Sequence, residues 1–350
     1  MARVLIIATS RKTRGGITSV VKAHEKGEQW KKYHCVWIQT HRDGPAWRKI
    51  WYFSTALVQY ILLLPFCDIV HFHVSEILSM RRKCMMIPLA KLMHKKIIVH
   101  FHSCSLDTTV RSKYHDKYRY LFSSADVSIV LSEYWRKALV EELGIPSDKV
   151  KVLYNPCPCI DTSVECKYTK TKSILYAGTI CHRKGYEVLI RAFAKIAKKY
   201  PDWKVILAGN GEIENGKAIA DDLGISDQID FLGWVSGEEK DKAFRESMIF
   251  CLPSYAEGFP MAVLDAWAYG LPVITTPVGG IPDIAIDGKN LLLFNSGDIY
   301  GLANQMEKMI LNEKLRESIS LESTILARTT FNIKTINKQL GDIYKDLSNK

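Results

Sequence analysis

The stretch YAEGFPMAVLDAWAYGLPVITT, residues 255–276, contains the two acids on which the interpretation of this chain depends. Glu257 and Asp265 stand eight positions apart around a Gly-Phe-Pro turn. The residues between and after them are apolar and predict a short buried helix followed by a buried strand. Carboxylates in such surroundings are not ordinary solvated charges, so we expect each of them to face a partner or a ligand.

Short runs rich in Val, Ile and Leu alternate with helical stretches along the chain. Six lie in the first half, ARVLIIAT, HCVWIQT, DIVHFHV, KIIVHFHS, VSIVLS and KVKVLYN, and six in the second, SILYAGT, KVILAG, QIDFLGW, MIFCLPS, PVITT and NLLLF. Continuous apolar strands that alternate with helices predict parallel sheets covered on both faces. Twelve strands are too many for one ordinary open sheet, so we expect two doubly wound, Rossmann-like α/β domains facing a cleft.

A loss of periodicity marks the boundary between these domains. Residues 157–171 contain several turn-formers and no repeating apolar pattern, which predicts a linker. We therefore expect an N-terminal domain over 1–156 and a C-terminal domain over 172–330. The last segment, 331–350, has apolar residues at alternating spacings of three and four, and this predicts an amphipathic helix that packs back on the N-terminal domain.

The charge is unevenly distributed between the two halves. The whole chain carries a net charge of +11, but residues 1–156 hold 25 Lys and Arg against 12 Asp and Glu, and the remainder is slightly acidic. A basic half fits a nucleic acid, an anionic membrane or an anionic substrate, and charge alone does not rank these partners. No recognised nucleic-acid-binding module is present, so we expect no nucleic-acid partner.

Cysteine usage and the N-terminus predict a cytoplasmic protein. The nine cysteines include no metal-type CxxC pair, and we interpret them as reduced thiols. The opening MARVLIIATS has too short an apolar run for a secretory signal and instead predicts a first strand.

Residues 50–66, IWYFSTALVQYILLLPF, test this interpretation because they carry no charge. The run falls short of the roughly 20 apolar residues that a spanning helix needs. Pro65 ends it, and a predicted strand follows immediately. We therefore expect a buried or interfacial helix rather than a membrane span.

Two segments of the second half could bind an anion. In TICHRKGYEV, Arg183 and Lys184 lie between a strand end and a helix start, where cations suit a phosphate, although both could simply be surface residues. In the opening stretch, Pro260 suits a first helical turn, so the backbone N–H groups around it, from Gly258 and Phe259 to Met261, would face an anion.

An anion bound there would have Glu257 on one side and Asp265 on the other, and each carboxylate could accept hydrogen bonds from hydroxyls. A sugar nucleotide offers this pattern, with sugar hydroxyls, a diphosphate and ribose hydroxyls. The alternative is that Glu257 caps the helix and Asp265 binds a local cation. Glycoside hydrolysis would also use two acids, but its carboxylates flank an open site, whereas Asp265 lies inside a predicted helix.

These residues carry a family resemblance. The segment LPSYAEGFPMAVLDAWAYGLPVITTPVGGIPDI, residues 252–284, resembles the nucleotide-sugar signature of retaining GT-B glycosyltransferases of family 4, with Glu-x7-Glu nearly intact. GTICHRKG, residues 178–185, stands in place of that family's glycine-Arg-x4-Lys-Gly loop. YNP, FLGW and the terminal amphipathic helix follow in family order, so the likeness covers essentially the whole chain.

The resemblance implies roles for individual residues. Lys184 would bind the donor diphosphate, Glu257 would meet the transferred sugar, and Asp265 would hold the ribose. In the first half, Gly16 would approach the phosphates and His102 would lie by the sugar. Independently of the resemblance, the paired glycines Gly15 and Gly16 between a strand and a helix permit close backbone approach to a ligand, although a simple turn would use them too.

The sequence departs from the family pattern at two positions. Thr179 stands where the family has Arg, and Asp265 is one methylene shorter than the usual Glu. Arg183 could replace the missing cation. These departures keep two alternatives open, a degenerate partner subunit that does not catalyse transfer and a nucleotide-sugar epimerase of the same fold.

The resemblance implies a hexosyltransferase that moves a sugar, with retention, from a nucleotide-diphosphate donor to an acceptor hydroxyl. The basic clusters 81–83 and 95–96, with the apolar stretch 47–64, suit peripheral binding to an anionic cytoplasmic membrane surface and a lipid-linked glycan acceptor in cell-surface polysaccharide synthesis. A nicotinamide dehydrogenase would need GxGxxG, but Glu214 takes the third glycine's place in GNGEIE.

Paired histidines also permit a metal site. His71 and His73 share one face of a predicted strand, and His100 and His102 share one face of another. We interpret them as hydrogen-bonded core residues, because the resembled family needs no metal or other cofactor.

Overall fold

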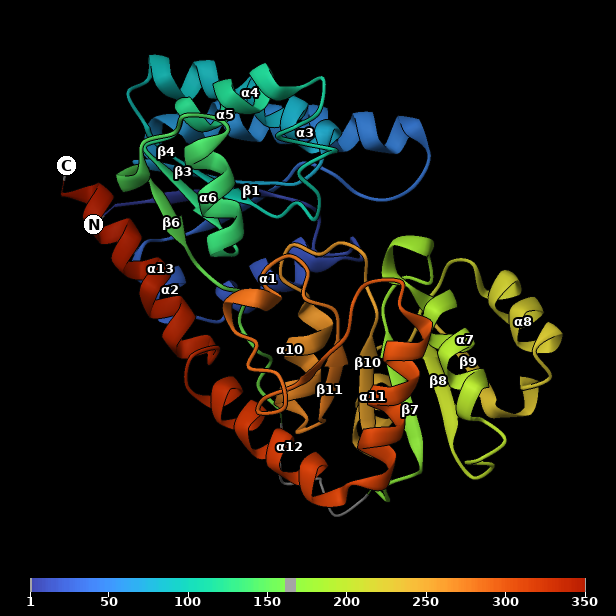
Figure 1. The fold of residues 1–350 in the computed structure, drawn as a ribbon. Coiled ribbons are helices and arrows are strands. Elements are labelled where there is room, and N and C mark those ends of the chain that lie inside the picture. The colour runs from blue at the N-terminus through green and yellow to red at the C-terminus, as the bar shows by residue number, and fades with distance from the viewer. Residues whose placement is uncertain (1, 161–167, 350) are drawn as a thin grey trace. The chain divides into compact units, whose positions relative to one another are not determined.

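The computed structural model describes residues 2–160 and 168–349. The chain forms two compact units, one made of Met1–Pro156 with Ile333–Lys350 and the other of Cys157–Asn332. The expected linker 157–171 includes residues 161–167, which lie outside the described residues. Each unit is a parallel sheet covered by helices (Figure 1).

The first unit is built on a six-stranded sheet with the order β2-β1-β3-β4-β5-β6, in which each neighbouring pair is parallel. The strands are β1 (Val4–Ala8), β2 (Val36–Gln39), β3 (Ile69–Val74), β4 (Lys96–Phe101), β5 (Val127–Val130) and β6 (Val150–Val152). β1 and β3 are buried along their whole length, which explains why they appear as uninterrupted apolar runs.

Side chains of alternating direction divide the core of this unit between the two faces of the sheet. Ile7, Phe72 and Val99 pack with apolar side chains of the helices on one face, and Ile6 and Ile98 pack with those on the other. The first face carries α3 (Ala46–Leu63), α4 (Ile77–Leu92), α5 (His115–Ser123) and α6 (Glu133–Glu141), and the second carries α1 (Gly16–Glu25), α2 (Glu28–Lys32) and α13 (Ile333–Ser348) (Figure 1).

The terminal helix α13 belongs to the first unit although it follows the second in sequence. Its apolar stripe buries Ile336, Leu340, Tyr344 and Leu347. The Tyr344 hydroxyl lies 2.7 Å from Nδ1 of His71 on β3. The amphipathic pattern of the last segment therefore corresponds to a helix that completes this unit's core.

The second unit has a parallel sheet of order β12-β11-β10-β7-β8-β9. Its strands are β7 (Ser173–Ala177), β8 (Lys204–Ala208), β9 (Ile229–Gly233), β10 (Ile249–Leu252), β11 (Val273–Thr275) and β12 (Leu292–Leu293). Its helices are α7 (Tyr186–Ile196), α8 (Ile213–Asp222), α9 (Glu238–Glu246), α10 (Met261–Ala268), α11 (Ile299–Leu311) and α12 (Glu313–Arg328). Each of the twelve apolar runs contains one of the twelve strands, so the predicted doubly wound fold is confirmed.

The charge-free stretch 50–66 was expected to form a buried or interfacial helix, and the structure rules out the buried alternative. Ala46–Leu63 forms α3, and Leu64–Phe66 forms a 3-10 turn, η1, that contains Pro65. Within α3 only Ala56 and Tyr60 are buried. By length and composition, Ala46–Phe66 could also cross a membrane. Apolar composition does not distinguish a core helix from one whose outer face is uncovered, and here most of the helix is uncovered.

A second correction concerns the basic cluster 81–83 on α4. Arg81 is exposed, but Lys83 is fully buried and its ammonium group donates hydrogen bonds to the hydroxyls of Thr40 and Ser79, each at 3.2 Å. Burial lowers the pKa of Lys83 to about 7. Lys83 is therefore part of the core and cannot contribute to a surface that attracts anions.

Candidate functional site

A tight turn after β7 positions the two predicted donor-site cations. His182–Lys184 form a single 3-10 turn, η4, and α7 begins at Tyr186, so Arg183 and Lys184 lie between the end of β7 and the start of a helix, as expected. Gly185 between them has a φ of +70°, and a Cβ there would lie 1.9 Å from the Pro253 carbonyl oxygen. Only glycine permits this approach, which presses the cationic turn against the loop after β10.

Lys184 and Glu257 meet where these two segments touch. Lys184 Nζ lies 2.5 Å from Glu257 Oε1, and Ser254 Oγ donates to the same oxygen at 2.7 Å. Glu257 is only 7% exposed, so its charge is held by these partners rather than by water. The cation predicted to bind a diphosphate and the acid predicted to meet the sugar are therefore in direct contact.

Arg183 supplies a second cation beside the same acid. Its Nη1 donates to the Ala256 carbonyl oxygen at 2.7 Å and lies 3.8 Å from Glu257 Oε2. Thr179, by contrast, is exposed, and its carbonyl oxygen accepts a hydrogen bond from the Tyr176 hydroxyl at 2.7 Å. Arg183 thus places positive charge beside the acid, and its role as a replacement for the family's Arg stays a prediction.

The backbone of Glu257 and Gly258 is fixed by the loop 278–280. The Gly280 N–H donates to the Gly258 carbonyl oxygen at 2.8 Å. Gly279 has a φ of +59°, and a Cβ there would lie 2.1 Å from the Glu257 carbonyl oxygen. The glycine pair therefore allows two loops to pack backbone against backbone, which restricts where the Glu257 side chain can point.

The helix α10 begins directly after residues 257–260. Pro260 is the N-cap of α10 rather than its first residue, and no side chain caps it, so the alternative in which Glu257 caps this helix is wrong. Phe259 is buried, with its ring centroid 5.6 Å from that of Phe331. The first N–H groups of α10 lack intrahelical partners and favour an anion near residues 258–260.

Asp265 has a cation of its own. It is largely buried on α10, and its Oδ2 accepts a hydrogen bond from Lys240 Nζ of α9 at 2.8 Å. Burial raises the pKa of Asp265, and the Lys240 ammonium acts in the opposite direction. The expected alternative of a local cation thus describes the arrangement seen. The ribose-binding role of Asp265 stays a prediction.

In the first unit, Gly15 and Gly16 lie at the start of α1, just beyond β1. Gly15 is the N-cap with a φ of +145°, it provides no side-chain cap, and a Cβ there would meet no atom within 4 Å. The N-terminal turn of α1 therefore offers backbone N–H groups at the carboxyl edge of the sheet, where ligands of such folds bind.

His102 follows the end of β4 at this same sheet edge. Its backbone N–H donates to the Val74 carbonyl oxygen at 2.7 Å, and Nε2 of its imidazole lies 2.9 Å from His73 Nδ1. Burial lowers the pKa of His102 to about 3, so the imidazole is neutral near pH 7. A neutral imidazole can donate one hydrogen bond to a sugar hydroxyl or accept one from it, which is compatible with the predicted role.

Behind His102 lies a row of buried imidazoles. His73 and His100 are direct neighbours across β3 and β4. Nitrogens of His71, His73 and His100 all lie within 4.8 Å of one another. The His71 ring stacks on that of His73 with an angle of 21° and on that of His100 with an angle of 12°. Both ring nitrogens of His100 are buried without a hydrogen-bond partner among the described residues, so the expectation of hydrogen-bonded core histidines is wrong for His100. The expected absence of a metal stays a prediction.

Family models match both units. Residues 5–159 match the model described as Glycosyltransferase Family 4, and residues 162–323 match the one described as Glycosyl transferases group 1. The chain belongs to the group 1, family 4 glycosyltransferases. The two matched segments together span nearly the whole chain, so membership does not depend on the signature around Glu257 alone.

Curated relatives of this family member align with only part of it. A D-inositol 3-phosphate glycosyltransferase of Corynebacterium jeikeium is 35% identical over 156 residues, 42% of this chain and 37% of the relative. An uncharacterized glycosyltransferase of Haemophilus influenzae is 31% identical over 160 residues, 45% of each chain. The chain thus spans less than half the length of these relatives.

Solved structures match the fold of this family member over its full length. Alr3699/HepE of Anabaena, crystallised with UDP, has a TM-score of 0.78 at 16% identity, covering 98% of this chain and 100% of that one. Sucrose-phosphate synthase of Thermosynechococcus elongatus has a TM-score of 0.78 at 18% identity, with 99% of both chains covered. At such low identity these likenesses establish the fold alone, which is GT-B.

Ser254 and Lys240 contact the two predicted acids, but neither was among the predicted site residues. Ser254 follows the end of β10, so the rule that ligands lie beyond strand ends would have found it. Lys240 belongs to the charged run EEKDK on α9, which looks like a solvated helix face. Only the packing of α9 against the sheet shows that this lysine faces Asp265.

Proposed function

We propose that this protein transfers a hexose-type residue, with retention of anomeric configuration, from a nucleotide-diphosphate sugar to an acceptor hydroxyl. The observation that carries the proposal is the contact of Lys184 and Ser254 with the buried Glu257 inside the family signature. Departure of a nucleoside diphosphate builds negative charge on the leaving group and positive charge on the sugar ring. A site that holds cations beside a buried acid suits both developing charges.

Each residue has a part in this chemistry. Lys184, with Arg183 beside it, stabilises the diphosphate as it leaves, and the N-terminal turn of α10 adds backbone N–H groups. Glu257 faces the sugar, and Asp265 accepts hydrogen bonds from ribose hydroxyls, in competition with Lys240. No metal ion is needed in this scheme, because fixed cations neutralise the leaving group.

The names of solved relatives narrow the first donors to try. Structures of Alr3699/HepE were determined with UDP-glucose as well as with UDP, at a TM-score of 0.77 and 16% identity to this chain for the UDP-glucose complex. The apo structure of a lipopolysaccharide outer core galactosyltransferase, WaaB, has a TM-score of 0.69 at 20% identity. UDP-sugars are therefore the first donors in our proposal, and a lipid-linked glycan in cell-surface polysaccharide synthesis is the proposed acceptor.

The outer face of α3 supports a membrane-bound acceptor. Most of its large apolar side chains are exposed, including Trp47 at 66% and Trp51 at 65%. The exposed residues Leu78, Met85 and Leu92 of α4 recur every seven positions and form an apolar stripe. Exposed apolar surface of this extent in a basic unit suits the interface of an anionic bilayer. We propose peripheral binding to the cytoplasmic face of a membrane.

The proposal is tested first by thermal shift with UDP, GDP, ADP and their common sugar conjugates, with and without EDTA. A ligand at about 100 times its dissociation constant should stabilise the fold by about 2.7 kcal/mol. We expect one nucleotide family to raise the melting temperature of the wild type, with no effect of EDTA. Lys184→Ala should reduce the shift, and Lys198→Ala, an exposed lysine of the same unit, should leave it unchanged.

The sugar conjugate that gives the shift is then incubated with membrane extract, and the labelled product is isolated. Transfer to a lipid-extractable product supports the whole proposal. Binding without any transfer supports the partner-subunit alternative, and isomerisation of the donor without acceptor supports an epimerase. Absence of a shift with every nucleotide contradicts the proposed donor site.

A further inference from the structure

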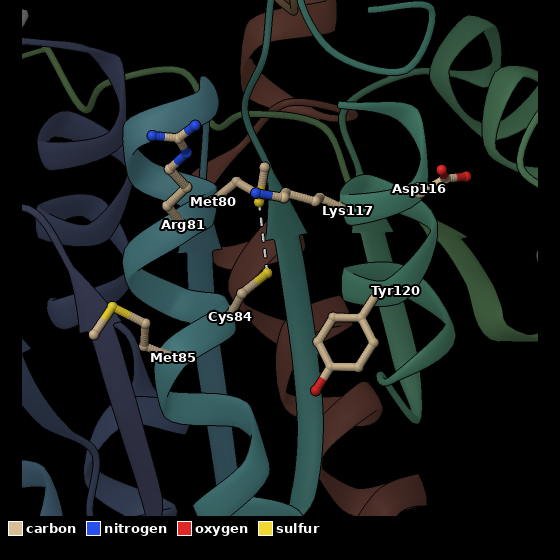
Figure 2. Close-up of a pocket in the computed structure, with 7 residues that line it drawn as sticks. All are labelled: Met80, Arg81, Cys84, Met85, Asp116, Lys117 and Tyr120. Atoms are coloured by element: carbon tan, nitrogen blue, oxygen red, sulfur yellow. Dashed lines mark hydrogen bonds between the residues drawn. The ribbon is translucent and has the colours of Figure 1, made fainter. Parts of the chain in front are cut away.

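A groove between α4 and α5 lies outside the donor-site segments, and the proposed function leaves it unexplained. It has a volume of about 520 Å³, within the range of small-molecule sites. Its lining residues are Met80, Arg81, Cys84, Met85, Asp116, Lys117 and Tyr120 (Figure 2). The lining combines sulfur-containing and aromatic side chains with charges, which is the composition of a site for an amphipathic molecule.

Two cations that line the groove and Lys113, which does not line it, gather around the ring of Tyr114. The Arg81 guanidinium lies 5.2 Å, Lys113 Nζ 5.6 Å and Lys117 Nζ 5.9 Å from the centroid of the Tyr114 ring. In the part of the chain that the structure describes, none of these three cations forms an ion pair. Three uncompensated cations around one ring can neutralise a phosphate.

The acid in the lining, Asp116, does not neutralise the cations Arg81 and Lys117 of the groove. Figure 2 shows the Lys117 side chain extending from α5 toward Met80 on α4, while the Asp116 carboxylate points away from α4. Asp116 lies in the first turn of α5, where a carboxylate is favoured by the helix dipole. The groove itself therefore presents cations and apolar surface.

The topology places the cationic end of the groove at a functional edge of the sheet. α4 begins just after β3, and α5 begins after the loop that follows β4, so the first turns of both helices lie at the carboxyl edge of the parallel strands. Arg81, Lys113 and Lys117 belong to this end, and His102 follows β4 at the same edge. Cys84, Met85 and Tyr120 continue the groove away from the edge, between the two helices.

Away from its cationic end, the groove is continuous with the exposed apolar surface of α4. Met85 lines the groove and also belongs to the exposed stripe of α4 with Leu78 and Leu92. Tyr60 of α3 donates from its hydroxyl to the Met86 carbonyl oxygen at 3.0 Å, which fixes α3 beside α4. A hydrocarbon chain in the groove would therefore leave it toward the same face that we propose to contact the bilayer.

We propose that this groove binds the hydrocarbon chain of a phosphate-bearing lipid, whose phosphate is held by Arg81, Lys113 and Lys117. The charge complementarity and the apolar exit together select an anionic lipid over a soluble anion or a neutral lipid. The identification of this lipid with the glycan acceptor rests on the proposed function; the binding of the lipid does not.

The test measures binding by isothermal titration, with three probes and no donor. Farnesyl phosphate carries both a chain and a phosphate, inorganic phosphate lacks the chain, and farnesol lacks the charge. We expect farnesyl phosphate to bind at least 100-fold more tightly than inorganic phosphate and at least 10-fold more tightly than farnesol. Equal binding of farnesyl phosphate and inorganic phosphate would overturn the proposal.

Variants separate the two ends of the site. The double substitution Arg81→Ala with Lys117→Ala should weaken farnesyl phosphate at least 10-fold and leave farnesol unchanged. Met85→Glu, at a position 66% exposed and therefore tolerant of charge, should weaken both chain-bearing probes. Lys338→Ala on α13, on the opposite face of the sheet, is the matched control. Wild-type affinity in the Arg81 and Lys117 double variant would contradict the site.

A readout of donor binding keeps this test apart from the proposed function. The groove variants should retain the thermal shift with the donor nucleotide, because the predicted donor cations lie in the other unit. Lipid binding with no sugar transfer would leave the groove proposal standing and contradict the transferase proposal. Sugar transfer with no binding of farnesyl phosphate would support the transferase proposal and contradict the groove proposal.

Discussion

Lys184 and Glu257 form an ion pair of 2.5 Å at a point where two loops of the second unit meet, and Ser254 binds the same carboxylate oxygen. A donor diphosphate that binds Lys184 must compete with Glu257 for that cation. If Lys184 and Glu257 have the roles that we propose, donor binding is coupled to release of the Glu257 carboxylate, and the two effects can be separated by mutation.

Glu257→Gln should separate them. The amide keeps the size of the side chain and an acceptor for Ser254 but removes the charge that holds Lys184. We expect nucleoside diphosphate to bind about 3- to 10-fold more tightly, a change of roughly 1 kcal/mol, while sugar transfer falls at least 100-fold. Titration calorimetry and a transfer assay measure the two quantities. Glu239→Gln on α9 is the control, and weaker nucleotide binding by Glu257→Gln would argue against competition.

Gly185→Ala should disrupt the turn that carries Lys184. The substitution adds strain at a φ of +70° and places a Cβ 1.9 Å from the Pro253 carbonyl oxygen, so the loops must separate. Gly224→Ala has a similar φ of +66° with no atom within 4 Å of the new Cβ, and it isolates the cost of the backbone conformation.

The two variants are compared by urea unfolding. We expect Gly224→Ala to lower the free energy of unfolding by about 1 kcal/mol and Gly185→Ala to lower it by roughly 3 kcal/mol or more. Gly185→Ala should also lose the thermal shift with donor nucleotide. Equal destabilisation by the two substitutions would mean that the contact with Pro253 does not restrict this turn.

Much of this geometry could be predicted from the sequence, because it follows from patterns that are local in the chain. The twelve buried strands appear as continuous apolar runs, and the residues just beyond their ends include Lys184, Glu257 and His102. Lys240 could not be predicted in this way, since its pairing with Asp265 depends on how α9 packs rather than on any spacing. The burial of Lys83 was equally hidden, because its neighbours Arg81 and Arg82 make the segment look like a surface.

Lys240→Ala should make stability depend on pH through Asp265. Burial already raises the pKa of this carboxyl, and the substitution removes the charge and the hydrogen bond of Lys240 that oppose this effect, so the pKa of Asp265 rises further. A raised native pKa means that the folded state holds its proton more tightly than the unfolded state, so stability falls as pH rises through that range.

The variant should therefore lose roughly 1 to 3 kcal/mol at pH 7 and much less at pH 4. Urea unfolding at both pH values measures this, with Lys242→Ala on the same helix as the control. Adding Asp265→Asn to Lys240→Ala should remove most of the pH dependence. A loss that is the same at pH 4 and pH 7 would show that Asp265 is not the group responsible.

The outer face of α3 should carry membrane binding. Replacing Trp47 and Trp51 together with Glu removes two exposed aromatic anchors and adds two negative charges, so binding to anionic vesicles should fall at least 10-fold. Co-sedimentation with vesicles that contain phosphatidylserine measures this at low and high salt. Leu311→Glu, a 67% exposed residue of the other unit, is the control. Unchanged sedimentation of the tryptophan variant would contradict a role for α3.

The most direct test of the central claim is slow hydrolysis of the donor selected by thermal shift, with water as the acceptor. Release of nucleoside diphosphate is measured over hours for the wild type, Lys184→Ala and Lys198→Ala. We predict release by the wild type and by Lys198→Ala, and a rate at least 100-fold lower for Lys184→Ala, about 2.7 kcal/mol of transition-state stabilisation. Equal rates for all three proteins would contradict the claim that Lys184 stabilises the leaving diphosphate.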